Sequence, residues 1–325
     1  MNHAKDGTQF TIGIPTYNGE LTIADCIESC LASIQFADIT NVEVLVVDNC
    51  STDDTVQRVK EFAIQYPGVV RVIANASNIG LDKNVDRVFY EARGTYVKLL
   101  GDDDVIDTYF VKTFHETISR YPCDVLLSAY LDYEQYRSHD SFGLTALHKH
   151  ERDFSILVNS RGIAGQIASI TCKRTSYLDV DSFHADDTNN KFLYIVTSLV
   201  SKGVSVFDSV PKVYVRAGSP RFTTAPMSSF TSQMKTIRMY QALLIHGGPW
   251  TPIERKFIGN LIRSQRRYSL TFIDFIHRYT DLNSLQVIKL FYPLGKSLPS
   301  FYLRYLPMAL VPKRIGNYIA RAIKG

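Results

Sequence analysis

The segment Gly94-Thr-Tyr-Val-Lys-Leu-Leu-Gly-Asp-Asp-Asp104 places three consecutive carboxylates directly after a short β-forming run. Residues 95–100 combine β-branched, aromatic and aliphatic side chains, which favours a strand. The polar run that follows marks the place where this strand ends. Strands that end in charged groups are typical of α/β domains, in which ligands bind beyond the carboxyl ends of the strands.

An alternation of strands and helices extends in both directions from this segment. The further predicted strands cover residues 9–14, 42–47, 69–74 and 124–129, and the predicted helices cover residues 21–34, 51–65, 82–92 and 107–121. Pro15 is expected to stop the first strand. Strands that are apolar on both faces and are separated by helices predict an α/β fold with an open, mostly parallel, doubly wound sheet.

The composition is that of an ordinary folded protein. Of 325 residues, 45% are hydrophobic and 21% are charged, as in average globular chains. The five cysteines include no Cys-x-x-Cys pair, so neither a disulfide framework nor a zinc site is expected. The first residues do not resemble a signal peptide, and Lys289, Lys296 and Arg304 interrupt the most apolar region. We therefore expect a cytoplasmic protein without a transmembrane helix.

Charge divides the chain into two regions. Residues 1–225 contain 21 Lys and Arg against 29 Asp and Glu, net −8, whereas residues 226–325 contain 15 against 3, net +12. The segment 216–226 is rich in Gly, Pro, Ser and Thr, as connections are. We predict an α/β domain over residues 1–225 and a basic, helical region over residues 226–325.

The first four predicted strands end in polar residues, namely residues 15–18, 48–53, 75–84 and 101–104. No Gly-x-Gly-x-x-Gly sequence follows the first strand, and the Gly-Lys-Ser at residues 295–297 lacks its partner glycine because residue 290 is Leu. The sequence therefore supports neither a nicotinamide-dependent enzyme nor a P-loop NTPase.

The adjacent carboxylates Asp102, Asp103 and Asp104 repel one another if they are packed at a strand end. In a partly buried site, each raises the pKa of the others unless a cation compensates. Oxygen ligands suit Mg²⁺ or Mn²⁺, which complete their coordination with water and substrate phosphates. Two interpretations stay open from spacing alone: a metal site for a diphosphate substrate, or a cap for the helix predicted to begin near Asp107.

Four segments resemble the family 2 glycosyltransferases of GT-A fold. They are Thr11-Ile-Gly-Ile-Pro-Thr-Tyr-Asn18, Glu43-Val-Leu-Val-Val-Asp-Asn-Cys-Ser-Thr-Asp53, Asn78-Ile-Gly-Leu-Asp-Lys-Asn84 and the segment that ends at Asp104. The Asn-x-Gly-x-Asp-x-Asn pattern is similar to that of the abequosyltransferase-like enzymes of bacterial O-antigen or capsule synthesis. The resemblance covers about residues 9–130. It implies an inverting transfer of a sugar from a nucleotide diphosphate sugar to an acceptor hydroxyl.

The resemblance also implies roles for individual residues. The base and ribose pocket would be lined by Pro15, Thr16, Tyr17 and Asn18. Tyr17 would face the base, unless it packs on the core from a plain turn. Asp48 would accept hydrogen bonds from the base or ribose, or cap the next helix, or do both. Lys83 would neutralise a phosphate unless it is a solvated lysine.

The triplet matches the family's Asp-x-Asp motif, which implies that Asp104 and Asp102 bind Mn²⁺ or Mg²⁺. Asp102 or Asp103 would then touch the ribose or the donor sugar.

An inverting transfer also requires a base that takes the proton of the acceptor hydroxyl. The family places a Glu-Asp pair before a helix for this role, and here the matching stretch is Phe183-His-Ala-Asp-Asp-Thr188, before a predicted helix at 190–201. The Glu is missing, and an N-cap role for the Asp-Asp pair is the alternative. The candidates in order of preference are Asp187, Asp186 and His184, with Asp179 and Asp181 kept as further ones.

The basic region contains helical patterns at residues 230–244, 253–275 and 285–291, and then a stretch at 298–314 that interleaves Tyr and Phe with Arg and Lys. That mixture favours a helix in a membrane interface. It predicts contact with the anionic cytoplasmic face of the inner membrane and a lipid-linked glycan acceptor. Packing on the α/β domain is the alternative, and nucleic-acid binding is not expected.

Two competing functions are weighed against the transferase. A sugar-nucleotide pyrophosphorylase would carry a Gly-rich loop after its first strand, and residues 15–18 are not one. A noncatalytic, membrane-associated nucleotide-binding module would not need the intact carboxylate triplet.

Overall fold

The computed structural model describes residues 10–136, 143–153, 156–157, 166–216, 236, 239–247, 250–252, 254–256, 258–260 and 262. Its centre is a nine-stranded sheet in the order β3-β2-β1-β4-β8-β6-β9-β5, with β7 paired to β9. The strands are β1 (Phe10–Thr16), β2 (Val42–Asp48), β3 (Val70–Ala74), β4 (Tyr96–Leu99), β5 (Val105–Ile106), β6 (Val125–Asp132), β7 (Leu147–Glu151), β8 (Ile170–Lys173) and β9 (Val204–Val215).

The first four strands form the parallel half of the sheet, as predicted. β1 pairs in parallel with β2 and β4, and β2 pairs in parallel with β3. β8 lies between β4 and β6 and is antiparallel to both, while β5 and β7 are antiparallel to β9. The predicted mostly parallel sheet is confirmed, with antiparallel strands that the sequence analysis did not identify.

The prediction that Pro15 ends the first strand was wrong, because β1 continues to Thr16. The carbonyl of Thr16 accepts a hydrogen bond from the N–H of Asn49 on the β2 side. Alternation along the strand therefore turns the nitrogen of Pro15 to the other side, where pairing with β4 stops at Gly13. A proline at this position removes no ladder hydrogen bond.

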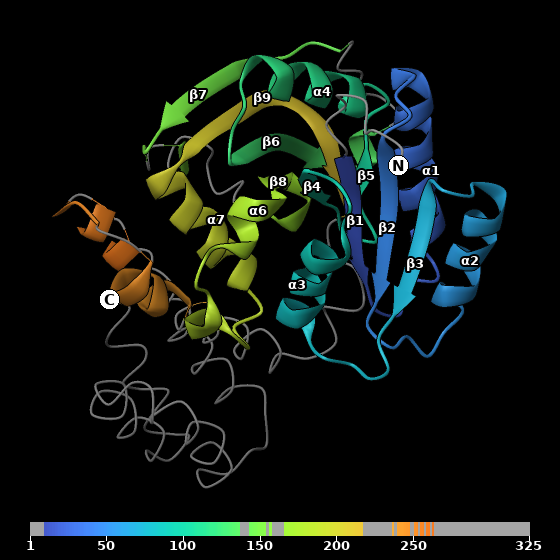
Figure 1. Ribbon diagram of the computed structural model, residues 1–325, viewed down its shortest axis with the longest axis horizontal. Coiled ribbons are helices and arrows are strands. Elements are labelled where there is room, and N and C mark those ends of the chain that lie inside the picture. Colours follow the sequence, from blue (N-terminus) through green and yellow to red (C-terminus); the bar gives the residue numbers. More distant parts are fainter. Residues whose placement is uncertain are drawn as a thin grey trace, which may run out of the picture.

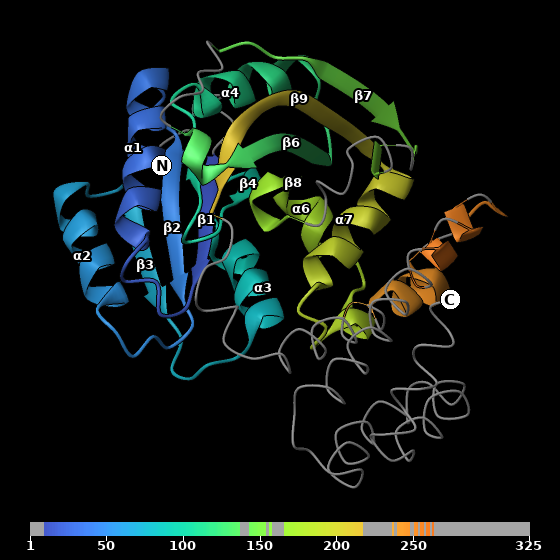
Figure 2. The same ribbon diagram turned by 180° about the vertical axis from the view of Figure 1, so that it is seen from behind.

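Helices cover both faces of the sheet (Figures 1 and 2). One face is covered by α1 (Ile23–Ala37), α2 (Thr55–Gln65) and α4 (Phe110–Arg120), and the other by α3 (Leu81–Glu91), α6 (Arg174–Leu178) and α7 (Lys191–Lys202). Each set packs into its own buried cluster, which confirms the doubly wound architecture. Three short 3-10 turns complete the described elements: η1 (Tyr133–Gln135), η3 (Ile167–Ser169) and η4 (Phe183–Ala185).

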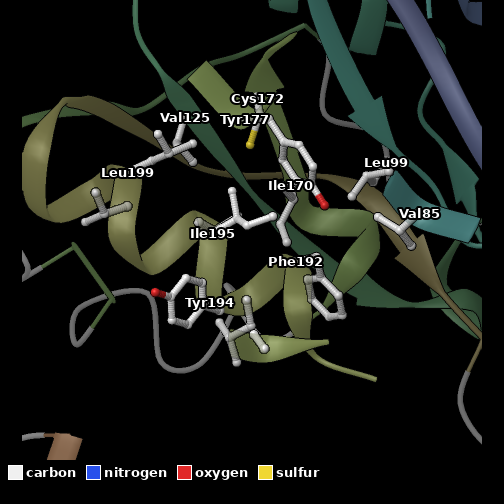
Figure 3. Close-up of a cluster of buried hydrophobic side chains, with 14 of the residues drawn as sticks. Val85, Leu99, Val125, Ile170, Cys172, Tyr177, Phe192, Tyr194, Ile195 and Leu199 are labelled. Carbon is white, nitrogen blue, oxygen red and sulfur yellow. The ribbon is translucent and has the colours of Figure 1, made fainter. Parts of the chain in front are cut away.

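Helix α7 lies in the larger apolar cluster, where its side chains meet those of α3, α6 and the sheet (Figure 3). The ring of Tyr177 stacks on Phe89 with 3.4 Å between the centroids. The buried apolar residues among the described part of the predicted basic region belong to the same cluster, namely Met239, Leu243, Trp250, Ile258 and Ile262. This part of the region therefore packs on the α/β domain.

Three other predictions concern parts of the chain outside the described residues. They are the boundary near residue 225, the helix at 285–291 and the stretch at 298–314. Among the helices that are described, none is both long and apolar enough to cross a membrane.

Candidate active site

The ends of β1, β2 and β4 meet at one edge of the sheet and bring buried acidic side chains together. We call Asp48, Asp102, Asp103 and Asp104 the carboxylate edge. The hydroxyl of Thr16, at the end of β1, donates to Oδ2 of Asp102 at 2.5 Å. Asp48 is 1% exposed and accepts the N–H of Ser51 at 3.0 Å, together with the Ser51 hydroxyl.

The residues after β1 are tied to the residues after β2. Asn18, in the left-handed region at φ 53°, donates its N–H to Oγ of Ser51 at 2.8 Å. Its Oδ1 accepts the N–H of Thr52 at 2.9 Å. Tyr17 is 43% exposed, so its ring does not belong to the core and the alternative of a packed turn is not supported.

Asp104 is the most buried member of the triplet. It is 2% exposed, and its Oδ1 accepts the N–H of Arg216 at 3.0 Å. Burial raises the pKa of Asp104 to about 7, with a further increase from Asp103 and Asp102, against the opposing effect of the Arg216 N–H. Lys98, fully buried below the triplet, has its pKa lowered by burial to about 7 and donates to the carbonyl of Ala168.

Two glycines leave room for these carboxylates. A Cβ at Gly19 would lie 2.5 Å from Oδ2 of Asp102, and a Cβ at Gly101 would lie 2.5 Å from Oδ2 of Asp104. Atoms that close would force the carboxylates to move, so the small residues allow the acidic groups to approach the backbone.

The triplet does not cap the following helix. α4 begins at Phe110, because Val105–Ile106 forms β5, and Asp107 accepts the N–H of Tyr109 at 2.6 Å. In the described part of the chain, no three His, Cys, Asp or Glu side chains form a ready metal cluster. The donor set nevertheless suits a cation that takes two carboxylates and fills its other positions with water and ligand oxygens.

Four asparagines that received no individual role organise the loop after β3. Nδ2 of Asn75 donates to Oδ1 of Asn49 at 3.0 Å and to Oδ1 of Asn84 at 2.8 Å. Nδ2 of Asn49 donates to Oδ1 of Asn78 at 2.9 Å, and Oδ1 of Asn75 accepts from Arg87. The signal available in the sequence was an asparagine directly after each of two strands, Asn49 after β2 and Asn75 after β3.

Arg216, read in the sequence as the start of a connection, belongs to the edge. Its Nε donates to the carbonyl of Asp103 at 3.3 Å, and its guanidinium lies 3.8 Å from the centre of the Tyr133 ring and donates to Asp25 at 3.2 Å. Its position follows from the pairing of β9 with β5, a strand pair that local sequence does not reveal.

The second acidic group lies in the turn before α7. We call residues 186–190 the acidic turn. Asp186 pairs with Nζ of Lys191 at 2.6 Å, whereas Asp187 is exposed and has φ 59°. Neither caps α7, because the N–H groups of Asn189 and Lys191 donate to Asp82 on α3, at 2.7 and 3.1 Å.

The remaining candidates lie at the surface or in other contacts. The ring of His184 stacks on that of His246 with 3.6 Å between the centroids. Lys83, Asp179 and Asp181 are exposed. The structure therefore separates the predicted residues into the carboxylate edge and the acidic turn, which α3 connects.

A family model described as "Glycosyl transferase family 2" matches residues 11–174, about half of the chain. Among curated proteins, the poly(ribitol-phosphate) beta-N-acetylglucosaminyltransferase TarS of Staphylococcus aureus is 34% identical over 120 residues, which are 37% of this chain and 20% of TarS. The glycosyltransferase GlyG of Streptococcus pneumoniae is 23% identical over 125 residues, 38% of this chain and 40% of GlyG. The matched segment is therefore less than half of either relative.

Solved structures of glycosyltransferases share the fold. S. aureus TarS 1-349 in complex with UDP-GlcNAc superposes with a TM-score of 0.63 at 19% identity, covering 95% of this chain and 88% of that one. The mannosyltransferase PcManGT of Pyrobaculum calidifontis, in complex with GDP-Man and Mn2+, gives a TM-score of 0.56 at 11% identity, covering 95% and 87%. The expected GT-A architecture is confirmed.

Proposed function

The chain belongs to glycosyl transferase family 2, and from this premise we propose that it moves a sugar from a nucleotide diphosphate sugar to an acceptor hydroxyl with inversion. The observation that carries the proposal is the carboxylate edge, where the ends of β1, β2 and β4 hold buried acids in one hydrogen-bonded layer. Ligands of parallel sheets bind at this edge. Residues 1–225 would form the catalytic domain.

We assign donor binding to the residues after β1 and β2. The exposed ring of Tyr17 can stack on the base, and Asp48 can accept hydrogen bonds from the base or ribose. Pro15, Thr16 and Asn18 would line the same pocket. Lys83, exposed on the first turn of α3, can approach a phosphate.

We propose Asp104 and Asp102 as the ligands of Mn²⁺ or Mg²⁺, with Asp103 beside the ribose or donor sugar. The raised pKa of Asp104 supports this assignment, because close, buried carboxylates call for a compensating cation. When bound, the cation offsets the negative charge of the diphosphate leaving group. The Mn2+ complex of the structurally similar mannosyltransferase also supports it.

We propose Asp187 as the group that takes the proton of the acceptor hydroxyl, with Asp186 as the second candidate. Asp187 is exposed to an incoming acceptor, whereas Asp186 is engaged by Lys191. The ammonium of Lys191 lies 2.6 Å from Oδ1 of Asp186, so an incoming hydroxyl would have to compete with it for that carboxylate.

The donor can be identified by a thermal-shift screen of the purified protein with Mn²⁺ and a panel of nucleotide sugars. UDP-GlcNAc and GDP-mannose come first, since structurally similar transferases are solved with these donors. We expect one nucleotide class to raise the melting temperature, because a ligand that binds only the folded state stabilises it. If no nucleotide sugar raises the melting temperature, with Mn²⁺ or with Mg²⁺, the proposal is wrong.

We further propose a lipid-linked glycan in bacterial surface polysaccharide synthesis, such as O-antigen or capsule, as the acceptor. The relative TarS acts on poly(ribitol-phosphate), a polymer, and the net charge of +12 over residues 226–325 suits an anionic membrane at the cytoplasmic face. The chain would then meet its soluble donor in water and its acceptor at the membrane.

Liposome flotation tests the membrane part of this proposal. The protein should float with anionic vesicles at low salt and bind more weakly as salt rises, because surface charges are screened over about 8 Å at physiological ionic strength. Replacing Lys313 and Arg314 by Glu should weaken flotation, while the same change at the exposed Arg58 and Lys60 of α2 should not. A protein that ignores anionic vesicles at low salt has no such membrane contact.

A further inference from the structure

We propose that Asp82, on the first turn of α3, is a positioning residue that sets turnover by fixing the acidic turn. The inference rests on the proposed function, since it takes Asp187 or Asp186 as the acceptor of the proton. Asp82 and Lys191 are 109 positions apart in the chain, so only the fold brings them together.

The carboxylate of Asp82 takes the place of a local cap on α7. Asp82 is 4% exposed; its Oδ2 accepts the N–H of Asn189 at 2.7 Å, and its Oδ1 accepts the N–H of Lys191 at 3.1 Å. These amides lie at a helix start, where N–H groups lack intrahelical partners, and the N-cap residue Asn190 makes no side-chain capping bond. A carboxylate is also favoured there by the helix dipole.

The backbone of the acidic turn needs such support. Asp187 and Asn189 both have φ 59°, in the left-handed region that is sparsely populated by residues with a Cβ, although Asn and Asp adopt it more readily than the others. Residues in sparsely populated conformations persist only where their surroundings hold them. Asp82 contributes two hydrogen bonds at this place, one to each side of Asn190.

One turn further along α3, Asp86 holds the side chain of Lys191, the first residue of α7. Nζ of Lys191 lies 2.7 Å from Asp86 and 2.6 Å from Asp186, and Asp86 also accepts the hydroxyl of Tyr177 at 3.1 Å. Positions four apart lie on one helix face. The same face of α3 therefore fixes both the backbone of the acidic turn, through Asp82, and the carboxylate of Asp186, through Lys191.

Other side chains near the start of α3 hold the carboxylate-edge side. Nδ2 of Asn84 donates to the carbonyl of Val47, next to Asp48, at 3.0 Å, and Oδ1 of Asn78 accepts the N–H of Gly80 at 3.0 Å. The segment 78–84 thus has two structural tasks, with the asparagines facing the strand ends and Asp82 facing the acidic turn. Helix α3 sets how the acidic turn lies relative to the donor site.

Asp82→Asn tests the inference, because an amide of nearly the same size offers one acceptor oxygen where the carboxylate offers two. The turnover number kcat, measured with whichever nucleotide sugar of the panel reacts, should fall on the order of 10- to 100-fold, as for other small misplacements of reacting groups. The affinity for UDP with Mn²⁺ and the donor KM should stay unchanged. Glu91→Gln is the matched control, since Glu91 pairs only with Arg87, at 3.6 Å, among the ion pairs of the described residues.

A double-mutant cycle separates positioning from plain stabilisation. If Asp82 acts through Asp187, Asp82→Asn should lower kcat no further in an Asp187→Asn background. An equal further fall in both the Asp187→Asn and the Asp186→Asn backgrounds would overturn the proposal. Asp86→Asn gives a second, milder variant, for which we expect a smaller fall in kcat with the same unchanged donor KM.

Hydrogen exchange of the acidic turn gives a readout that needs no turnover. The amides of residues 186–191 should exchange faster in Asp82→Asn, or in Asp86→Asn if the first variant does not fold, and as in the wild type in Glu91→Gln. Unchanged exchange in the variant used would overturn the role of α3. Absence of turnover by the wild-type protein with every donor would instead defeat the proposed function, while the exchange result still decides whether α3 fixes the turn.

Discussion

The carboxylate edge and the acidic turn are both acidic, yet they are built in opposite ways. At the edge, Asp48 and Asp104 are 1% and 2% exposed and are held by backbone N–H groups. In the turn, Asp187 is exposed and Asp186 is paired with Lys191. Buried, crowded carboxylates suit a cation and a diphosphate, and an exposed carboxylate suits the removal of a proton from a group that arrives from solvent.

In these two regions, position in the fold decides the burial and the contacts of an acidic side chain more than its sequence neighbours do. Asp102-Asp-Asp104 and Asp186-Asp187 are both runs of adjacent aspartates in the sequence. The first run ends a central strand and is enclosed by β1 and β9, whereas the second precedes a helix and is held by α3. Substitutions in the two regions should therefore change different steps of the reaction.

Asp187→Asn should have the largest effect. A positioned general base contributes about 10²- to 10⁴-fold to a rate, so kcat should fall by that order, while donor affinity stays as in the wild type because the ground state does not use the base. Steady-state kinetics and calorimetry with the donor measure the two quantities. Full turnover in this variant would move the role to Asp186.

Asp104→Asn should weaken the binding of the donor, which Asp187→Asn should leave unchanged. Loss of a charged ligand should weaken Mn²⁺-dependent donor affinity by more than the roughly 10- to 100-fold that loss of an outer-shell partner costs a metal site. Calorimetric titration of the donor with and without Mn²⁺ measures it, and Asp54→Asn on the exposed start of α2 is the control. An unchanged affinity in Mn²⁺ would show that Asp104 is not a ligand.

The pH dependence of stability should differ between the wild type and Asp104→Asn. Because the pKa of Asp104 is raised to about 7 from 3.8, its contribution to stability is fully present below pH about 4 and is lost as pH rises through about 7. With a chelator present, Asp104→Asn should melt a few degrees above wild type at pH 8. The difference should shrink as pH falls towards 5, and a difference independent of pH would contradict the assigned shift.

Thr16→Val should have the smallest effect. It removes the hydroxyl that donates to Asp102 at 2.5 Å, and a hydrogen bond to a charged group contributes about 1.5–3 kcal/mol. Chemical denaturation should show a loss of stability of that order, and kcat should change less than in Asp187→Asn. Thr40→Val, at an exposed loop position, should leave stability unchanged.

Most of the carboxylate edge could be predicted from the sequence, because parallel pairing by itself places the carboxyl ends of the strands at one edge of the sheet. Asp48 is the last residue of β2, and the triplet begins three residues after the end of β4. Arg216 and Lys98 could not be assigned, since their contacts depend on the pairing of β9 with β5 and on the burial of one lysine in an apolar strand.

The acidic turn shows why the second half of the site was harder to predict. Local sequence offered an Asp-Asp pair before a helix, for which an N-cap role was the alternative. The cap comes from Asp82, 107 positions away from Asn189, and no local pattern encodes that contact. The strands β5, β7, β8 and β9 escaped prediction for the same reason, because their pairing joins segments that are distant in the chain.

The most direct test of the central claim is the release of nucleoside diphosphate from the donor that the thermal-shift screen identifies, measured without acceptor in Mn²⁺ and again in a chelator. We expect slow release that requires the metal. Asp104→Asn should abolish this release, and Asp187→Asn should lower it without loss of donor binding. A protein that binds the donor tightly and releases no nucleoside diphosphate under either condition would be a binding module, and the account would be contradicted.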